Sequence, residues 1–338
     1  MAQIDIVVTE VGPLDGLQMV TDFMPTEVKK WWVSAMAEAG VPEIDVASFV
    51  PPSVIAQFAD SDELCRHVQT IPGLSSRAYA PNLKGAERAL KCGATYISCG
   101  FSSSAEHSLS NYRKSREAQF DQFTGLVELC KCQPEASRPR LQVSFSCVFG
   151  CSIQGVVPER DNIDYAVKFI EAGADEIQLC DTVGYADPRQ VSRLVKAIRN
   201  EIGDRMASLH FHDTRGLGLA NVLAGLEQGI IHFDSSIGGL GGCPFAPGAT
   251  GNINTEDLVF MLEAMGLRTG IDIGRLMAVR AALMDKMPGV AFSGNLARAG
   301  LPKGFVPARS APKCLGQTER PSQGLRRIGI QGLRGSPE

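Results

Sequence analysis

The feature that most constrains the fold of this 338-residue chain is a unit that occurs eight times in succession. Each unit begins with a short strand-like run and continues with a longer stretch compatible with a helix. The strand-like runs cover residues 4–11, 43–50, 76–80, 96–101, 142–149, 176–181, 208–213 and 232–237. Parallel strands need a crossover connection, which is usually a helix, so this alternation predicts a parallel sheet. Eight such units can close into a (β/α)8 TIM barrel.

The stretches between the runs show helical periodicity and helix-ending signals. Helix-compatible segments include residues 26–39, 84–91, 162–172 and 188–202. In residues 162–172 the apolar side chains recur at three- and four-residue steps, which is typical of an amphipathic helix. Three segments end at Gly40, Gly93 and Gly173, and we expect each glycine to take the left-handed conformation that closes a helix.

A doubly wound open sheet is the alternative architecture. Its dinucleotide fingerprint, G-x-G-x-x-G after the first strand, is missing from residues 11–16. We therefore expect one barrel domain over residues 1–306. From Pro307 the composition shifts to Pro, Gly, Ser, Arg and Gln, which bury too little apolar area to offset ordering entropy. Residues 307–338 are predicted to be a disordered C-terminal extension, with a substrate-closing or partner-binding arm as the alternative.

Charge and cysteine content exclude several classes of protein. Lys plus Arg is 33 against Asp plus Glu of 37, and this slightly acidic balance argues against nucleic acid as a partner. No apolar run approaches the roughly 18 residues that span a bilayer, so no membrane partner is expected. The ten cysteines lack the paired spacing of a zinc site and the density of a disulfide scaffold. With no signal-peptide pattern at the N-terminus, we expect a cytoplasmic protein.

The active site of a TIM barrel lies at the C-terminal ends of its strands, and polar residues follow several predicted strands there. They are Glu10, Asp15 and Gln18 after the first, Asp45 and Ser48 at the second, Thr182 after the sixth, and His210, His212 and Arg215 at the seventh. We expect these side chains to meet at one mouth of the barrel.

His210 and His212 are the strongest candidates for metal binding. Two residues apart on a strand, their side chains point to the same face. A lone histidine is more often a hydrogen-bonded structural residue, but a pair at a strand end favours a metal site. Asp15 is the natural anionic ligand, and an asparagine carbonyl can supply another oxygen. Nitrogen and oxygen ligands with open water positions suit Mg²⁺ or Mn²⁺ better than a thiolate-bound zinc.

Cys243 is the second candidate. It lies in the sequence Gly-Leu-Gly-Gly-Cys-Pro, where consecutive glycines permit unusual backbone angles and close approach to a ligand. A glycine-rich loop that carries a thiol can cover a site and transfer a proton. The structural alternative is a small buried apolar residue, which is the ordinary role of cysteine in a core.

Six motifs together resemble the 3-hydroxy-3-methylglutaryl-CoA (HMG-CoA) lyase family. They are EVGPxDGLQ at residues 10–18, PNLKG at 81–85, DT at 181–182, HxHDT at 210–214, GLGGCP at 239–244 and GATGNINTED at 248–257. Any one motif is weakly specific, but the six occur in the same order, and the resemblance runs from about residue 4 to 306.

The resemblance implies a TIM barrel, a reaction and a set of site residues. The family cleaves HMG-CoA to acetyl-CoA and acetoacetate, which serves leucine breakdown, and a homodimer is expected. The implied ligands of the divalent metal are Asp15, His210, His212 and Asn252. Cys243 is implied as the proton-transferring residue, and His210 is expected to assist it. Glu10 and Asp45 are expected to organise the site, with Gln18, Ser48, Thr182 and Arg215 around the substrate.

The coenzyme A portion of an acyl-CoA partner is expected along the barrel mouth. Lys84 lies at a predicted helix start, and helix N-termini favour anions such as its phosphates. The alternative for Lys84 is a solvated surface residue.

One position departs from the family pattern. The family has arginine immediately before the metal-binding aspartate, and this sequence has Leu14. The arginine is expected to hold the developing enolate oxygen, and losing one such donor typically costs about 10²–10³ in turnover. Three interpretations stay open: an impaired homologue that still binds metal and acyl-CoA, an ordinary lyase with an isolated substitution, or compensation by another cation such as Arg215. Another acyl-CoA lyase, for example one acting on citramalyl-CoA, is the competing activity.

Overall fold

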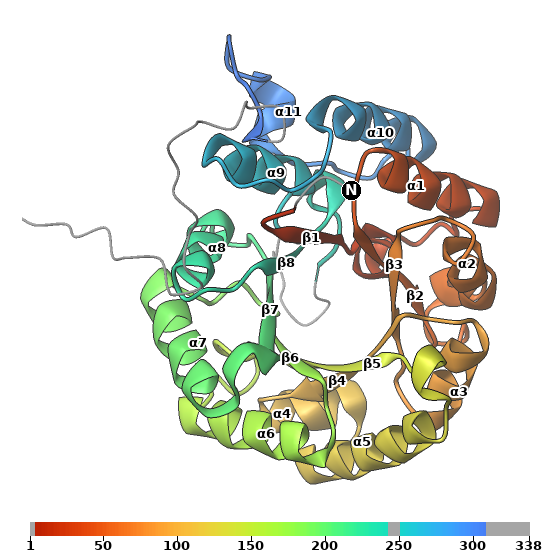
Figure 1. Cartoon of the computed structure of the whole chain (residues 1–338), viewed down its shortest axis with the longest axis vertical. Helices are drawn as coiled ribbons and strands as arrows, with labels where there is room; N and C mark the ends of the chain where they lie inside the picture. Colours follow the sequence, from red (N-terminus) through yellow and green to blue (C-terminus); the bar gives the residue numbers. More distant parts are fainter. Residues whose placement is uncertain (1–3, 243–250, 309–338) are drawn as a thin grey trace, which may run out of the picture.

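Eight parallel strands close into a barrel in the order of the sequence, which confirms the predicted TIM barrel (Figure 1). The computed structural model describes residues 4–242 and 251–308. The strands are β1 (Val7–Glu10), β2 (Glu43–Ser48), β3 (Ser75–Tyr79), β4 (Tyr96–Ser102), β5 (Arg140–Ser146), β6 (Glu176–Asp181), β7 (Met206–Phe211) and β8 (His232–Ser235). β1 and β8 pair in parallel and close the ring.

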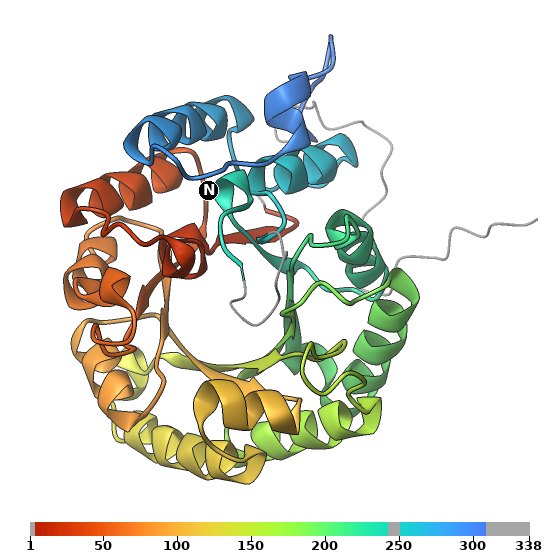
Figure 2. The same cartoon turned by 180° about the vertical axis from the view of Figure 1, so that it is seen from behind.

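Helices surround the ring of strands, and both views show most of them in one outer layer (Figures 1 and 2). They are α1 (Thr26–Glu38), α2 (Ser61–Val68), α3 (Leu83–Lys91), α4 (Ala105–His107), α5 (Arg116–Lys131), α6 (Glu159–Ala172), α7 (Pro188–Ile202), α8 (Gly218–Glu227), α9 (Thr255–Ala264), α10 (Ile273–Lys286) and α11 (Asn295–Ala299). The short α4 follows β4 inside that layer, and α11 packs against α9. After β8, α10 packs between α9 and α1 and so completes the layer. No helix among the described residues is long and apolar enough to cross a membrane.

Most of the predicted boundaries hold, and the differences have local causes. Gly40, Gly93 and Gly173 have φ angles of 97°, 78° and 118°, which confirms the left-handed helix ends. The fifth strand was predicted to run to residue 149 but ends at Ser146, because Cys147 has a φ of 58° and turns the chain out of the strand. Residues 309–338, most of the predicted extension, lie outside the described residues, as does Cys243.

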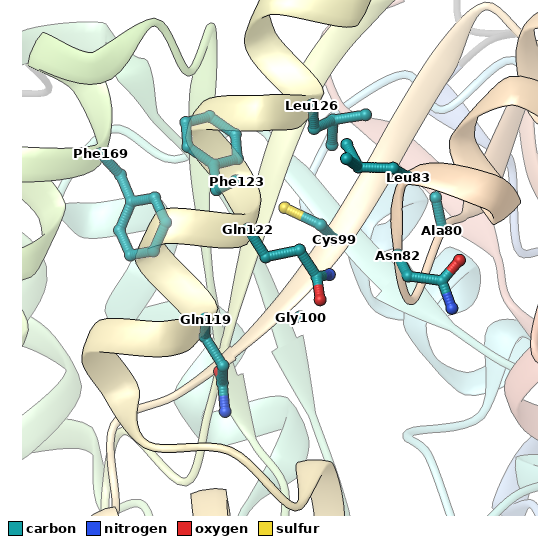
Figure 3. Close-up of a pocket in the computed structure, with 10 residues that line it drawn as sticks. All are labelled: Ala80, Asn82, Leu83, Cys99, Gly100, Gln119, Gln122, Phe123, Leu126 and Phe169. Atoms are coloured by element: carbon teal, nitrogen blue, oxygen red, sulfur yellow. The ribbon is translucent and has the colours of Figure 1, made fainter.

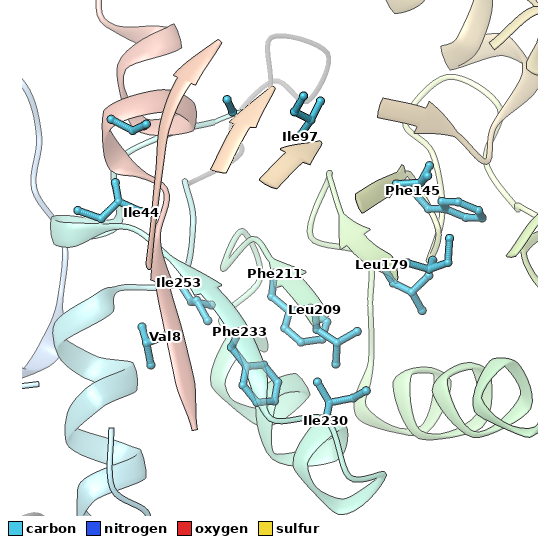
Figure 4. Packing of buried hydrophobic residues seen from close by; sticks show 14 of the residues in the cluster. Val8, Ile44, Ile97, Phe145, Leu179, Leu209, Phe211, Ile230, Phe233 and Ile253 are labelled. Carbon is cyan, nitrogen blue, oxygen red and sulfur yellow. The ribbon is translucent and has the colours of Figure 1, made fainter. Parts of the chain in front are cut away.

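The apolar side chains of the strands face the helices. Val8, Ile44, Leu209 and Phe233 are fully buried, and Figure 4 shows them in the core cluster. A Cβ on Gly225 of α8 would lie 2.4 Å from Leu209 Cδ1 and 3.2 Å from Phe233 Cε1, so only glycine lets this helix approach the sheet so closely. This outer layer supplies most of the hydrophobic stabilisation, at about 25 cal/mol per Å² of apolar surface buried.

The alternate side chains point into the barrel, and many of them are polar. Arg77 of β3 contacts Asp234 of β8, although these strands are not neighbours. Gln178 of β6 donates to the same carboxylate at 2.8 Å. These bonds can form only across the interior. TIM-barrel interiors are usually filled by branched apolar residues, so the polar filling marks this interior as part of the site rather than as a core.

The short helix α4, which follows β4, contains a buried histidine that should make stability depend on pH. His107 is 2% exposed, and its Nδ1 lies 2.9 Å from Ser102 Oγ. Burial lowers the pKa of His107 to about 4. The unfolded chain takes up a proton near pH 6.5, so this contribution to stability is present above that pH and is lost as pH falls towards 4.

We expect the free energy of unfolding of the wild type to fall by about 2 kcal/mol more than that of His107→Gln between pH 7.5 and pH 5. Glutamine keeps a hydrogen-bonding group near Ser102 but does not titrate. Urea unfolding of both proteins at the two pH values measures the difference. An identical pH dependence would show that His107 is not held neutral by the fold.

Candidate active site

The turn after β1 places Asp15 at the C-terminal mouth of the barrel. The turn runs from Gly12 to Gly16, and Val11 connects it to Glu10 at the end of β1. Glu10 is fully buried and accepts hydrogen bonds from Gly12 N, Ile237 N and Thr255 Oγ1 at 2.9, 3.0 and 2.8 Å. Burial raises the pKa of Glu10 to about 8. Glu10 therefore joins the β1 turn to the segment after β8.

The end of β7 brings two imidazole rings next to Asp15. His210 and His212 face the same side, and their Nε2 atoms lie 3.1 Å apart. His212 Nε2 lies 3.9 Å from Asp15 Oδ2. Burial and the nearby His210 lower the pKa of His212 to about 3, so this ring is neutral and keeps a lone pair for a ligand. The predicted pairing of the two histidines with Asp15 is present in the structure.

Asn252 completes this group from the segment after β8. Its amide nitrogen donates to Asp15 Oδ2 at 2.6 Å and to Leu240 O at 2.9 Å, and a β-bridge pairs Asn252 with His212. A Cβ on Gly241 would lie 2.5 Å from Asn252 Nδ2 and 2.9 Å from Asp15 Oδ2. The glycine-rich segment therefore lies directly against the group, at a position where φ is +117° and a side chain would not fit.

The donor set fits a divalent metal. One ligand atom each from Asp15, His210 and His212 lies within 4.8 Å of the other two. Asn252 Oδ1 is buried without a hydrogen-bond partner, although buried carbonyl oxygens are normally paired. Two facing imidazole nitrogens, a carboxylate and a free amide oxygen are ligands that Mg²⁺ or Mn²⁺ accepts. Within residues 4–242 and 251–308, no other three such side chains gather in this way.

Two interior residues support the group and were not singled out in the sequence. Asp234 Oδ2 lies 3.1 Å from His210 Nδ1, and Arg77 contacts both oxygens of Asp234 at 3.2–3.3 Å. Burial alone would raise the pKa of Asp234, but Arg77 and His210 lower it. An acidic residue inside the eighth strand was the available signal, and the structure places it in register with His210.

Asp45 and Asp181 are carboxyl groups with raised pKa values at the same mouth. Burial raises the pKa of Asp45 to about 7 against the opposing effect of Arg77, and the charges of Asp234, Glu43 and Asp15 raise it further. Asp45 Oδ1 is buried and has no hydrogen-bond partner. Burial also raises the pKa of Asp181 to about 6. Asp45 is therefore a group that can accept or release a proton near neutral pH.

Of the other candidate residues, some contact the metal-binding group and others bind the neighbouring loops. Gln18 donates directly to Asp15 Oδ1. Thr182 Oγ1 accepts from Cys147 N at 2.9 Å, and Ser48 O accepts from Ser61 Oγ at 2.7 Å. These last two bonds tie loops together at the strand ends.

Leu14 is half-buried beside Asp15, and Lys84 is exposed at the start of α3. Arg215 donates to Val183 O and Gly184 O at 3.1 and 2.9 Å, and its guanidinium stacks on Tyr185. Its charged group is thus bound to the loop after β6.

A separate small pocket lies between α3 and α5, outside the metal-binding group (Figure 3). Its polar side chains already have partners. Gln119 accepts from Ser102 N and donates to Ser108 Oγ, and Gln122 donates to Pro81 O. Because these side chains already have hydrogen-bond partners, we interpret the pocket as a packing gap. The candidate catalytic and metal-binding residues lie around Asp15 instead.

Comparison with known proteins gives a consistent result. The family described as HMGL-like matches residues 5–283. The mitochondrial hydroxymethylglutaryl-CoA lyase of Rattus norvegicus is 36% identical over 270 residues, which is 80% of this chain and 82% of that protein. The hydroxymethylglutaryl-CoA lyase of Bacillus subtilis is 35% identical over 284 residues, covering 83% of this chain and 93% of that protein.

Solved structures show the same likeness. An HMG-CoA lyase from Acinetobacter baumannii, in complex with coenzyme A and 3-methylmalate, superposes with a TM-score of 0.83 at 37% identity. The match covers 89% of this chain and 97% of that one. The hydroxymethylglutaryl-CoA lyase from Pseudomonas aeruginosa gives a TM-score of 0.82 at 34% identity, covering 88% and 98%.

Replacing His212 tests the metal assignment. His212→Ala removes one ligand, and we expect Mn²⁺ affinity to fall at least about 100-fold, because even changes behind the ligands cost 10–100-fold. Isothermal titration calorimetry with Mn²⁺ measures it. His232→Gln is the matched control, since this half-buried β8 histidine lies outside the group and should leave the affinity unchanged. Full Mn²⁺ affinity in His212→Ala would refute the assignment.

Proposed function

The chain belongs to the HMGL-like family, and from that premise we propose that it is a divalent-metal-dependent lyase that cleaves a carbon–carbon bond in HMG-CoA, releasing acetyl-CoA and acetoacetate. The observation that carries the proposal is the group formed by Asp15, His210 and His212 at the C-terminal mouth. Active sites of TIM barrels lie at this end. The relatives named as hydroxymethylglutaryl-CoA lyases, alike over four-fifths of this chain, support the choice of reaction.

The substrate has a tertiary hydroxyl and a carboxylate that suit this site. Asp15, His210, His212 and Asn252 are the residues that would hold the ion. A bound Mg²⁺ or Mn²⁺ would supply the positive charge that lowers the pKa of the substrate hydroxyl and fixes its orientation.

This chain's own residues then handle the protons. Asp45 has a pKa of about 7 and a free Oδ1, so it is suited to accept the proton of the substrate hydroxyl. As the hydroxyl carbon becomes a ketone, the adjacent carbon–carbon bond breaks and its electron pair passes to the thioester enolate. Cys243 is proposed to deliver a proton to that enolate. Gly241, two residues before Cys243 in the chain, lies against Asp15 and Asn252.

Leu14 leaves the enolate oxygen without a charged donor from this turn. Leucine cannot form a charge-assisted hydrogen bond, so we infer that turnover is low. Arg215 is the candidate for compensation, but its guanidinium is already bound to the carbonyls of Val183 and Gly184. Compensation by Arg215 would require it to leave those partners, so a weakly active lyase is the favoured proposal.

A second candidate activity is the cleavage of another hydroxyacyl-CoA, such as citramalyl-CoA. The specific observation is the relative from Acinetobacter baumannii, whose structure holds coenzyme A together with 3-methylmalate. That compound is a branched hydroxydicarboxylic acid and an isomer of citramalate. Its hydroxyl and carboxylate suit the same set of metal ligands, and cleavage of citramalyl-CoA would release pyruvate together with the same acetyl-CoA enolate. A metal- and acyl-CoA-binding protein without turnover is the remaining alternative.

Leu14→Arg tests the role of this position. We expect turnover of HMG-CoA with Mg²⁺ to rise by about 10²–10³, because the substitution restores one preorganised donor to the enolate oxygen. Acetoacetate formation, followed by mass spectrometry, measures it. Leu14→Met is the matched control, since it keeps the volume but adds no charge, and it should behave as the wild type. Citramalyl-CoA, with pyruvate as the readout, runs in parallel.

The outcomes separate the alternatives. If the wild type and Leu14→Arg are both inert on HMG-CoA, the leading proposal fails. Pyruvate formation by the wild type would establish the second activity. A wild type as fast as Leu14→Arg would show that another cation compensates, and Arg215→Ala should then abolish turnover.

A further inference from the structure

A buried arginine crosses the barrel interior directly beneath the metal-binding group. Arg77 is 2% exposed and reaches from β3 across the barrel to β8. Its Nη1 lies 3.2 and 3.3 Å from the two oxygens of Asp234. Its Nη2 donates to Glu43 Oε1 at 2.7 Å and to Thr9 Oγ1 at 3.0 Å. A buried charge without a partner is strongly destabilising, so the Arg77 guanidinium depends on these carboxylates to stay inside the barrel.

Asp234 connects this arginine to the metal-binding group. Its Oδ2 accepts from Gln178 Nε2 at 2.8 Å and from His210 Nδ1 at 3.1 Å. A carboxylate only accepts hydrogen bonds, so in the neutral ring of His210 Nδ1 carries the proton and Nε2 carries the lone pair. Nε2 is the atom that faces His212 Nε2 at 3.1 Å, on the side of Asp15. The hydrogen bond to Asp234 therefore selects the ring nitrogen that can bind a metal.

We propose that Arg77 is a positioning residue for the metal centre, which holds Asp234 in the orientation that fixes the ring and the tautomer of His210. The inference rests on the metal site of the proposed function but not on the identity of its substrate. Arg77 contacts no ligand of the group directly, so its effect must pass through Asp234.

The geometry favours this role over a purely structural one. By comparison, Lys29 on the outside of the barrel pairs with a single carboxylate, Asp60 at 2.8 Å, and donates to Gln57 O at 2.6 Å. Arg77 instead bridges Glu43 and Asp234, which come from β2 and β8, and so sets the position of the carboxylate between two strands. Without this contact, among the described residues, Gln178 and His210 remain as partners of Asp234, both on Oδ2, and Arg77 no longer constrains the orientation of the carboxylate.

Three variants test the proposal. Arg77→Met removes the charge at similar length, and Arg77→Lys keeps a charge that cannot bridge two carboxylates. Arg77→Met combined with Glu43→Gln removes one positive and one negative charge together and so guards against misfolding of the single variant. The matched control is Lys29→Met combined with Asp60→Asn, which removes a buried ion pair whose two residues are not among the metal ligands.

The readouts are Mn²⁺ affinity by calorimetry and the ¹⁵N signals of the His210 ring at pH 8.5 with Mg²⁺ present. In the wild type we expect a protonated Nδ1. In Arg77→Met and in the double variant we expect mixed tautomers and a 10–100-fold loss of Mn²⁺ affinity, with a smaller loss in Arg77→Lys. The control should bind Mn²⁺ as the wild type does, even if its melting temperature falls.

Each outcome bears on the proposal. Folded Arg77 variants with unchanged Mn²⁺ affinity and unchanged His210 signals overturn it, as does an equal loss of affinity in the Lys29 control. A wild type that binds no Mn²⁺ overturns it together with the metal site. If the wild type cleaves neither thioester but the Arg77 variants still lose Mn²⁺ affinity, the proposed function fails and this inference stands.

Discussion

Closure of the barrel between β1 and β8 is the constraint on which the site depends. The register pairs Glu10 with Ser235, at opposite ends of a long stretch of chain. This pairing brings the turn that carries Asp15 next to the segment that carries Asn252, and the two side chains meet at 2.6 Å. Parallel pairing also places all strand ends at one mouth, so that the β7 histidines face the same space. An open sheet would separate these groups.

Buried carboxylates hold the closed end together. Glu10 accepts from the backbone on both sides of the closure, and Glu256 accepts from Gly238 N at 3.0 Å while pairing with Arg280 at 2.9 Å. Such acceptors replace the regular ladder bonds that the loops lack, because buried backbone N–H groups need partners. The glycines of the segment then approach Asp15 and Asn252 at distances that a side chain would forbid. The backbone of this segment is therefore held by Glu10 and Glu256, which are not themselves metal ligands.

The sequence predicted those parts of the structure that arise from a regular spacing of residues along the chain. Strand and helix alternation defined the barrel, and the i, i+2 spacing of His210 and His212 predicted their common face correctly. What sequence could not show is contact across the interior, because no local pattern relates β3 to β8. Arg77 and Asp234 are ordinary polar residues within their strands, and their pairing appears only once the ring has closed. Likewise, the partners of Arg215 depend on the conformation of the loop after β6, which carries no periodic signal.

The position of the charges explains why Leu14 can be present without dismantling the site. Asp15, Asp45, Asp234 and Glu43 bring four carboxyl groups to one region, and such a cluster repels itself unless cations intervene. An arginine beside Asp15 would be one such cation. Arg77 already supplies a positive charge among these groups from inside the barrel, and a divalent ion bound by Asp15 at the mouth would supply more. The metal ligands therefore do not need a charge at position 14 to stay assembled. What that position can change is the stabilisation of charge on the substrate, so binding of metal and turnover of substrate should respond to different substitutions in this chain.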